Sequence, residues 1–248
     1  MCNFIHLHIH SEYSLLDGAC RVKQLVRKAK ELGQSAIAIT DHGCMYAAIE
    51  FYNEAIKQGI KPIIGCEVYV APRTRHDKVH KLDNSPYHLV LLCKDDEGYQ
   101  NLIKLVSIGY IEGFYNKPRV DIEILRKYSK GLIALSACLA GEVARDLTND
   151  DYDGAKKTAL LYNDIFGQGN YFIEVQNHDM DEQKRILPYQ YKLSRETGIP
   201  LVATNDAHYI NREDAKMQRV LLAIQTNTIL GEPNGMGFNG SEFYIKST

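Results

Sequence analysis

The chain has 248 residues, of which 45% are hydrophobic and 24% are charged, and its formal net charge is −2. This composition excludes disordered and fibrous proteins, and the near-neutral charge by itself indicates no polyanion partner. The six cysteines show no CxxC spacing, and no apolar run of about 18 residues occurs. We therefore expect a globular, cytoplasmic protein whose cysteines are reduced.

Short apolar runs alternate with segments of helical periodicity, which is typical of βα units. Helices are expected over 21–32, near 45–58, and after the acidic residues 95–97. The expected strands are 4–9, 36–40, 62–70, 89–93, 132–136, 171–176 and 201–204. This repetition favours a closed or nearly closed parallel α/β barrel, with an open doubly wound sheet as the alternative.

A basic, proline-bounded loop over 71–86 departs from this pattern. A solvated loop is the main interpretation, and contact with a phosphate backbone is the alternative. His76 and His80 lie between its basic residues, which are Arg73, Arg75, Lys78 and Lys81.

The end of the chain also departs from the pattern. Residues 225–248 show no strand–helix unit, and the run 241–248 is typical of a strand with no partner to pair with it. We therefore expect the chain to be a piece of something longer.

The strongest chemical signal is the opening motif His6-Leu-His8-Ile-His10. Side chains alternate along a strand, so the three imidazoles are expected on one face. Three aligned imidazoles are hard to satisfy without a metal, whereas an isolated HxH pair is more often the polar face of an edge strand. We read His6 as structural or exposed.

Other ligand-type residues directly follow predicted strands. Asp41 and His42 follow 36–40, Cys138 follows 132–136, and Asp206 and His208 follow 201–204. A lone aspartate there is usually a helix cap, but parallel barrels assemble their sites from the carboxyl ends of separate strands. The shared location favours a site over capping.

Three further residues are candidates on weaker grounds. Glu67 stands inside the apolar run 62–70, where a carboxylate is not buried unless it is paired or bound to metal. His178 follows the predicted strand 171–176 and is either a contact for a substrate phosphate or a solvated loop residue. His88 precedes its strand, so a parallel register does not bring it to the site.

Six segments together resemble the polymerase and histidinol phosphatase (PHP) superfamily. They are His8-Ile-His10-Ser, Ile39-Thr40-Asp41-His42-Gly43, Gly65-Cys66-Glu67, His88-Leu-Val-Leu-Leu, Ser136-Ala-Cys138-Leu-Ala-Gly-Glu142 and Thr204-Asn-Asp206-Ala-His208. The first and fifth are most similar to the PHP domains that begin bacterial DNA polymerase III α subunits. The resemblance runs from Asn3 to about Ala223.

The resemblance implies a distorted (β/α)7 barrel over 1–224, with a cleft for up to three metal ions, followed at 225–248 by the start of a polymerase segment. It departs mildly at Ala137, where a glycine is expected. The ligands it implies are His8, His10, Asp17, His42, Glu67, His88, Cys138, Asp206 and His208.

This mixed N/O/S ligand set suits zinc, manganese or iron and does not suit magnesium. Two or three such ions favour hydrolysis of a phosphoester. Glu67 is expected to bridge two ions, Asp206 to bind metal or orient the water, and His178 is a candidate contact for phosphate.

The resemblance implies a 3′–5′ exonuclease that proofreads the primer end of DNA in the bacterial cytoplasm, away from the membrane. Its partners are the remaining polymerase domains and, through them, other replisome subunits. Two alternatives stay open: a metal-bound scaffold without turnover, and a small-molecule phosphatase of the histidinol-phosphate type. The 248 residues alone are not expected to extend a primer.

Overall fold

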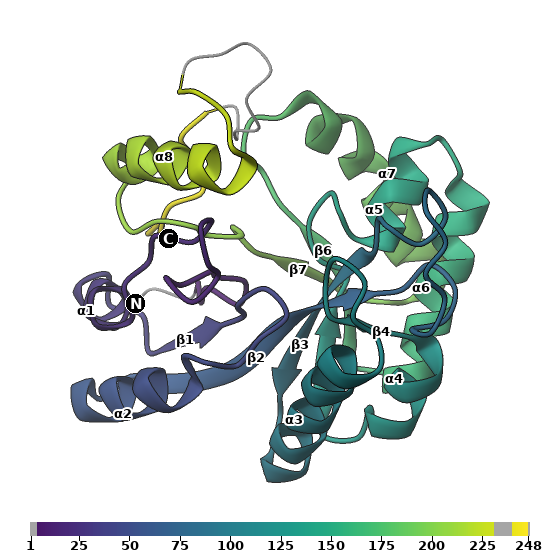
Figure 1. Cartoon of the computed structure of the whole chain (residues 1–248), viewed down its shortest axis with the longest axis horizontal. Coiled ribbons are helices and arrows are strands. Elements are labelled where there is room, and N and C mark those ends of the chain that lie inside the picture. Colours follow the sequence, from purple (N-terminus) through teal and green to yellow (C-terminus); the bar gives the residue numbers. More distant parts are fainter. Residues whose placement is uncertain (1–3, 231–239, 248) are drawn as a thin grey trace.

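The computed structural model describes residues 4–230 and 240–247, and Figure 1 shows strands on the inside and helices on the outside. The strands are β1 (Ala36–Ile39), β2 (Lys61–Val70), β3 (Tyr87–Cys93), β4 (Arg119–Val120), β5 (Leu132–Leu135), β6 (Tyr171–Val175) and β7 (Leu201–Ala203). The helices are α1 (Val22–Glu31), α2 (Ala48–Gln58), α3 (Asp96–Ile111), α4 (Ile122–Tyr128), α5 (Glu142–Thr148), α6 (Tyr152–Phe166), α7 (Asp181–Thr197) and α8 (Ala215–Thr226), with a 3-10 turn at Arg212–Asp214. None of these helices is long and apolar enough to cross a membrane.

The strands form one curled sheet in the order β1-β2-β3-β5-β6-β7, and β4 pairs with β2 beside this path. The pairs β1–β2, β5–β6 and β6–β7 are parallel. Strand β3 instead runs antiparallel to both β2 and β5. The distorted α/β barrel is confirmed, but the sheet is mixed, and the expectation of an all-parallel barrel is wrong.

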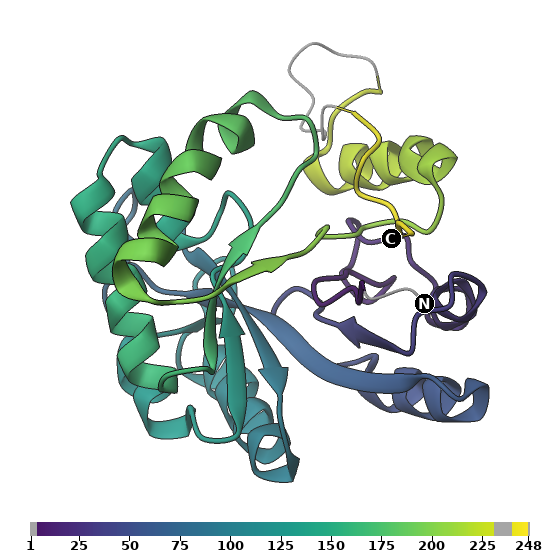
Figure 2. The same cartoon turned by 180° about the vertical axis from the view of Figure 1, so that it is seen from behind.

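The opening segment closes the barrel without being a regular strand. Residues 4–9, expected as a strand, form a single isolated bridge between Ile9 and Ala207. The backbone N–H of Ala38 donates to the His6 carbonyl at 2.9 Å, and that of His10 donates to the Ala207 carbonyl at 2.8 Å. The segment therefore lies between β1 and the chain after β7, as Figures 1 and 2 show from opposite sides.

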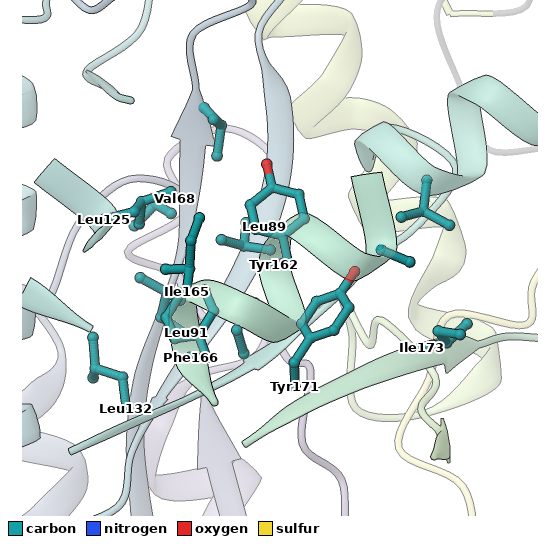
Figure 3. Packing of buried hydrophobic residues seen from close by; sticks show 14 of the residues in the cluster. Val68, Leu89, Leu91, Leu125, Leu132, Tyr162, Ile165, Phe166, Tyr171 and Ile173 are labelled. Carbon is teal, nitrogen blue, oxygen red and sulfur yellow. The ribbon is translucent and has the colours of Figure 1, made fainter. Parts of the chain in front are cut away.

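The largest core cluster fills the space between the sheet and α3–α7. Leu89 and Leu91 of β3 pack there against Tyr162 and Phe166 of α6 (Figure 3). Alternate residues of the same strand, Val90 and Leu92, belong to a second cluster. This period-two division explains how one strand packs against helices on one face and lines the barrel on the other.

The loop 71–86 is more ordered than a solvated loop. The Arg75 side chain is mostly buried, and its guanidinium donates to Asp121 at 3.0 Å and to Glu112 at 2.7 Å. Arg73 pairs with the buried Asp83. Arg73 and Arg75 are already paired with carboxylates of the protein. These two arginines therefore give no support to the alternative that the loop contacts a phosphate backbone.

Acidic partners for this loop come from a region where no strand or helix was expected. Strand β4 and helix α4 follow one another directly, with Asp121 between them. The Asp121 carboxylate accepts from the backbone N–H of Ile124, which caps α4, while it also binds Arg75.

The final segment is paired, which corrects the expectation of an unpartnered strand. Tyr244 forms a parallel bridge with Tyr209, and the backbone N–H of Ile245 donates to the Ile210 carbonyl at 3.3 Å. Phe243 and Ile245 are buried. Residues 240–247 thus pack against the barrel, and the division at 224–225 stays a prediction.

Candidate metal centre

Imidazole, carboxylate and thiol side chains converge at the mouth of the barrel where β1, β2, β5 and β7 end. They surround a cavity of about 260 Å³. The structure brings together all nine positions implied by the resemblance: His8, His10, Asp17, His42, Glu67, His88, Cys138, Asp206 and His208.

The antiparallel direction of β3 explains how His88 joins them. In an antiparallel pair the first residue of one strand lies beside the last residues of its neighbour. His88 is accordingly opposite Tyr69, near the end of β2. Its Nδ1 lies 2.9 Å from Oε1 of Glu67. The parallel register expected from the sequence is wrong for β3, and a parallel β3 would carry His88 away from the cluster.

Three groups of side chains each place their ligand atoms within 4.8 Å of one another. They are His10, His42 and His208; His8, His10 and Asp206; and Glu67, His88 and Cys138. His10 belongs to two groups. The spacing of the donor atoms therefore suits more than one divalent ion, with His10 between two of them.

Hydrogen bonds set the tautomers of the buried imidazoles. Nδ1 of His8 lies 2.7 Å from Oε1 of Glu174, and Nδ1 of His208 lies 2.8 Å from the Asp206 carbonyl. Both oxygens are acceptors, so each Nδ1 donates a proton and each Nε2 is the ring atom left to bind a metal. This orientation of metal-binding imidazoles by a second hydrogen-bonded group is common in proteins. Burial disfavours charge on His8, but Asp206 and Glu174 outweigh it and raise the pKa of that imidazole well above its usual value. His8 therefore also holds a proton on Nε2 until a metal displaces it.

His10 follows the same rule. Its Nδ1 lies 3.2 Å from Oγ of Ser14, whose hydroxyl proton is donated to Asp41. Ser14 is therefore the acceptor, and Nε2 of His10 presents a lone pair.

Asp206 supplies the clearest sign that a cation belongs here. Its Oδ1 is buried and has no hydrogen-bond partner among the described residues, yet it lies 3.1 Å from Nε2 of His10 and 3.3 Å from Nε2 of His8. These two nitrogens are themselves 3.1 Å apart. A buried carboxylate oxygen and two imidazole nitrogens this close together need a proton or a metal cation among them.

Glu67 occupies the middle of the cluster. Its Oε1 lies 2.9 Å from Nδ1 of His88 and 3.3 Å from Nε2 of His8, and its Oε2 lies 2.5 Å from Nδ1 of His42. The side chain is buried, as expected for a carboxylate with partners. Each oxygen faces a different set of imidazoles, which fits the expected bridging role.

The electrostatics keep these carboxylates ionised. Burial favours the neutral form of Asp206, but His8 and His208 outweigh it and hold the pKa of Asp206 well below its usual range. Burial is likewise outweighed at Glu67, where His88 and His42 hold the pKa of the carboxyl low. Both groups are therefore anionic and able to bind a cation.

The imidazoles divide into two kinds. Burial, together with His42 and His208, lowers the pKa of His10 to about 3, which keeps it neutral. Burial also disfavours charge on His42, but Glu67 and Asp17 raise the pKa of that imidazole to about 10. Metal binding at His42 would therefore displace a proton.

Cys138 and Asp17 lie at the edges of the cluster. Sγ of Cys138 is 3.8 Å from Nδ1 of His88, and burial with the nearby Asp206 raises the pKa of the thiol well above its usual value. A thiolate at this position needs a bound cation to stabilise it. Asp17 lies outside the three groups, but its Oδ2 is 3.1 Å from Nε2 of His42.

Two buried carboxylates outside the nine positions implied by the resemblance support the cluster. Glu174 in β6 accepts from Nδ1 of His8, from Nε2 of Gln176 at 2.7 Å and from Thr204. Its position inside an apolar strand is the same signal that identified Glu67. The other, Asp41, was weighed as a helix cap but instead accepts from the N–H and hydroxyl of Ser11 at 2.6 and 2.8 Å, and so fixes the loop that leads to Asp17.

His178 is placed differently from the other candidates. Its Nε2 lies 2.9 Å from the Asn205 carbonyl, and its Nδ1 lies 2.8 Å from Nε2 of Gln183, so both ring nitrogens have partners within the protein. The ring stacks on Phe243 at 3.8 Å and is buried. His178 is therefore not a solvated loop residue, and a contact with substrate phosphate would require these bonds to break.

Comparison with known proteins agrees with this geometry. A family model described as the PHP domain matches residues 6–178. The chain is 49% identical over 247 residues to the DNA polymerase III subunit alpha of Treponema pallidum and 46% identical over 248 residues to that of Thermus aquaticus. These alignments cover 99% and 98% of the chain but only 21% and 20% of the relatives, so the chain spans about a fifth of their length.

Solved structures with the same fold are distant in sequence. An amidohydrolase from Chromobacterium violaceum superposes with a TM-score of 0.52 at 18% identity, covering 82% of this chain and 87% of its own. A protein from Bifidobacterium adolescentis, described as a metal-dependent phosphoesterase, superposes with a TM-score of 0.51 at 15% identity, covering 96% and 92%. At these identities the likeness establishes the fold.

Proposed function

Because this chain belongs to the PHP domain family, we propose that its buried cluster binds two or three divalent ions and hydrolyses phosphodiester bonds in DNA. The observation that carries the proposal is the buried Oδ1 of Asp206, which has no hydrogen-bond partner among the described residues and faces two imidazole nitrogens beside an open cavity. The donor set favours zinc, manganese or iron over magnesium.

The relatives point to DNA as the substrate. Two of them are bacterial polymerase subunits, and we infer that this chain is the PHP part of such a subunit, acting as a 3′–5′ exonuclease on the primer end. Its partners would then be DNA, the other polymerase domains and, through them, further replisome subunits in the bacterial cytoplasm. The support for this inference is the similarity of the chain to about a fifth of each DNA polymerase III subunit alpha.

Each residue has a definite task in such a reaction. Divalent metals, when bound, neutralise phosphate charge and lower the pKa of a coordinated water. Glu67 would hold two ions through its two oxygens, and His8 and His10 would present Nε2 lone pairs fixed by Glu174 and Ser14. Asp206, at the cavity, would hold an ion or orient the attacking water.

A scaffold role is the second candidate, and one observation favours it. His8, His10 and Glu67 are completely buried, and with Asp206 they join three segments distant in the sequence. Metal bound there would crosslink the barrel whether or not any substrate reaches it.

Comparing substrates tests the three functions. We expect the full chain with Mn²⁺ to shorten a 3′-mismatched primer and to leave a small phosphomonoester almost untouched. Faster turnover of the monoester would favour a small-molecule phosphatase. No nuclease activity with Mn²⁺, Zn²⁺ or Fe²⁺ would leave the scaffold as the better account.

A further inference from the structure

A second cleft adjoins the metal centre on the side of Asp17, His42 and His88. It has a volume of about 350 Å³, and these three residues line both cavities. That volume is at the lower end of the roughly 300–1,000 Å³ of small-molecule sites. A ligand in this cleft would therefore reach the side chains that face the proposed metals.

Aromatic side chains dominate the walls of the cleft. Its tyrosines come from the loop after His10, the loop after β1, strand β2 and helix α3, and they are Tyr13, Tyr46, Tyr69 and Tyr110. Tyr46 is 63% exposed and Tyr110 is 39% exposed, so both present ring surface to solvent at the cleft. Exposed tyrosine rings that share one cleft are suited to stacking against a ligand.

The floor of the cleft is built rigidly against the cluster. The ring of Tyr69 stacks on His42 at 6.3 Å and meets His88 edge-on at 5.2 Å. Gly43, at φ +60°, lies so close to Tyr69 and Pro118 that a Cβ would come within 3.0 Å and 2.9 Å of them. The close approach of three segments at Gly43 thus fixes the position of Tyr69.

One cation completes the cleft. Within residues 4–230 and 240–247, Lys117 is the only lysine or arginine that lines it. Its ammonium lies 5.3 Å from the centre of the Tyr69 ring, and the side chain is exposed. Tyrosine rings for stacking beside one ammonium for phosphate are the combination that binds single-stranded nucleic acids.

We propose that this cleft binds the terminal nucleotide of a single-stranded nucleic acid end, with the base against the ring of Tyr46 and a phosphate oxygen near Lys117. The proposal rests on the proposed phosphodiesterase function and adds a subsite to it. Because the cleft shares Asp17, His42 and His88 with the metal centre, a base held there would place its own phosphodiester close to the ions. An unpaired end enters more easily than a paired one, since no base pair has to be broken.

Binding of two small probes to the full chain in Mn²⁺ tests the subsite, measured by calorimetry. The probes are dTMP and deoxyribose 5-phosphate, which differ only in the base. We expect dTMP to bind about tenfold more tightly, the size of one base–aromatic stacking contact. Tyr46→Ala should remove that difference, Tyr46→Phe should retain it, and Lys117→Ala should weaken both probes.

The control is Tyr191→Ala, which removes a 51% exposed tyrosine of α7 outside the cleft and should change neither affinity. Equal affinity for the two probes in the wild type, or equal effects of Tyr46→Ala and Tyr191→Ala, would overturn the subsite. A base preference that depends on Tyr46 in a protein without nuclease activity would support the subsite and overturn hydrolysis.

Discussion

The two ends of the barrel interior differ in chemistry although the same strands line both. At the amino end of β2, Ile63 lines an apolar cavity of about 750 Å³, and four residues further along the same face Glu67 lies in the metal centre. In β6, Phe172 lines the apolar end, and Glu174, two residues later, orients His8. Two steps of the period-two pattern in β2, and one step in β6, therefore separate side chains that support the barrel from side chains suited to chemistry.

This division implies that substitutions at the two ends act on different quantities. The apolar end contributes burial, which is measured as free energy of unfolding. The polar end holds carboxylates and imidazoles whose mutual arrangement is costly without a cation. Changes at the mouth should alter metal content and activity, whereas changes at the amino end should alter stability alone.

The largest effect is expected from Asp206→Asn. The change removes one charge and almost no volume, so nuclease activity should fall by orders of magnitude while the melting temperature shifts by a few degrees. Degradation of a 3′-mismatched primer in Mn²⁺ and thermal unfolding, measured on the same preparation, check this. Activity that survives the substitution would favour the scaffold role.

Metal content should respond next most strongly. The double variant His8→Ala with His10→Ala removes two Nε2 donors that face Asp206, so we expect it to lose bound transition metal. Elemental analysis under non-chelating conditions measures this, and chelation of the wild type should lower its melting temperature because metal binding is coupled to folding. A wild-type chain without zinc, iron or manganese would refute the site.

Much of this site could be predicted from local patterns, because its ligands follow apolar strands. His42, Cys138, Asp206 and His208 come directly after runs that fold as strands β1, β5 and β7. Glu67 was identified because a carboxylate in an apolar run needs a partner. Each of these arguments needs only the neighbouring sequence.

The parts that were not predicted depend on pairing between distant segments. His88 reaches the cluster because β3 reverses direction, and nothing in the run Leu89–Cys93 indicates its direction relative to β2. Arg75 is buried because Asp121 and Glu112 lie beside it, more than 35 residues away. Residues 4–9 are irregular, with a single isolated bridge to Ala207, and the strand β1 beside them has only four residues.

At the amino end, Leu92→Ala should lower the free energy of unfolding by about 2–3 kcal/mol. The value lies in the lower part of the usual range because Leu92 borders an existing cavity, so the substitution enlarges an opening and creates no new closed void. Denaturant unfolding measures the change. Metal content should match the wild type, and a loss of metal would show that the two ends are coupled.

A smaller effect is expected from Glu174→Gln, which keeps the shape of the side chain but removes the charge that orients His8. Metal affinity should fall about 10- to 100-fold, as is usual when the partner of a metal-bound histidine is changed. Competition with a chelator of known affinity measures it. Glu196→Gln, at an exposed helix position paired with Lys156, is the control and should leave affinity unchanged.

The smallest effect concerns backbone strain at the mouth. Ala137 has φ +63°, in the left-handed region, directly before Cys138, whereas Ala134 in β5 has no positive φ. Both alanines are buried, so replacing either with glycine loses one methyl group and gains chain entropy in the unfolded state. Only Ala137→Gly also relieves a left-handed conformation that costs an L-residue about 1–2 kcal/mol. Ala137→Gly should therefore lower the free energy of unfolding by about 1–2 kcal/mol less than Ala134→Gly does. Denaturant unfolding of the two variants measures this difference. Equal losses of stability would show that the backbone before Cys138 is unstrained.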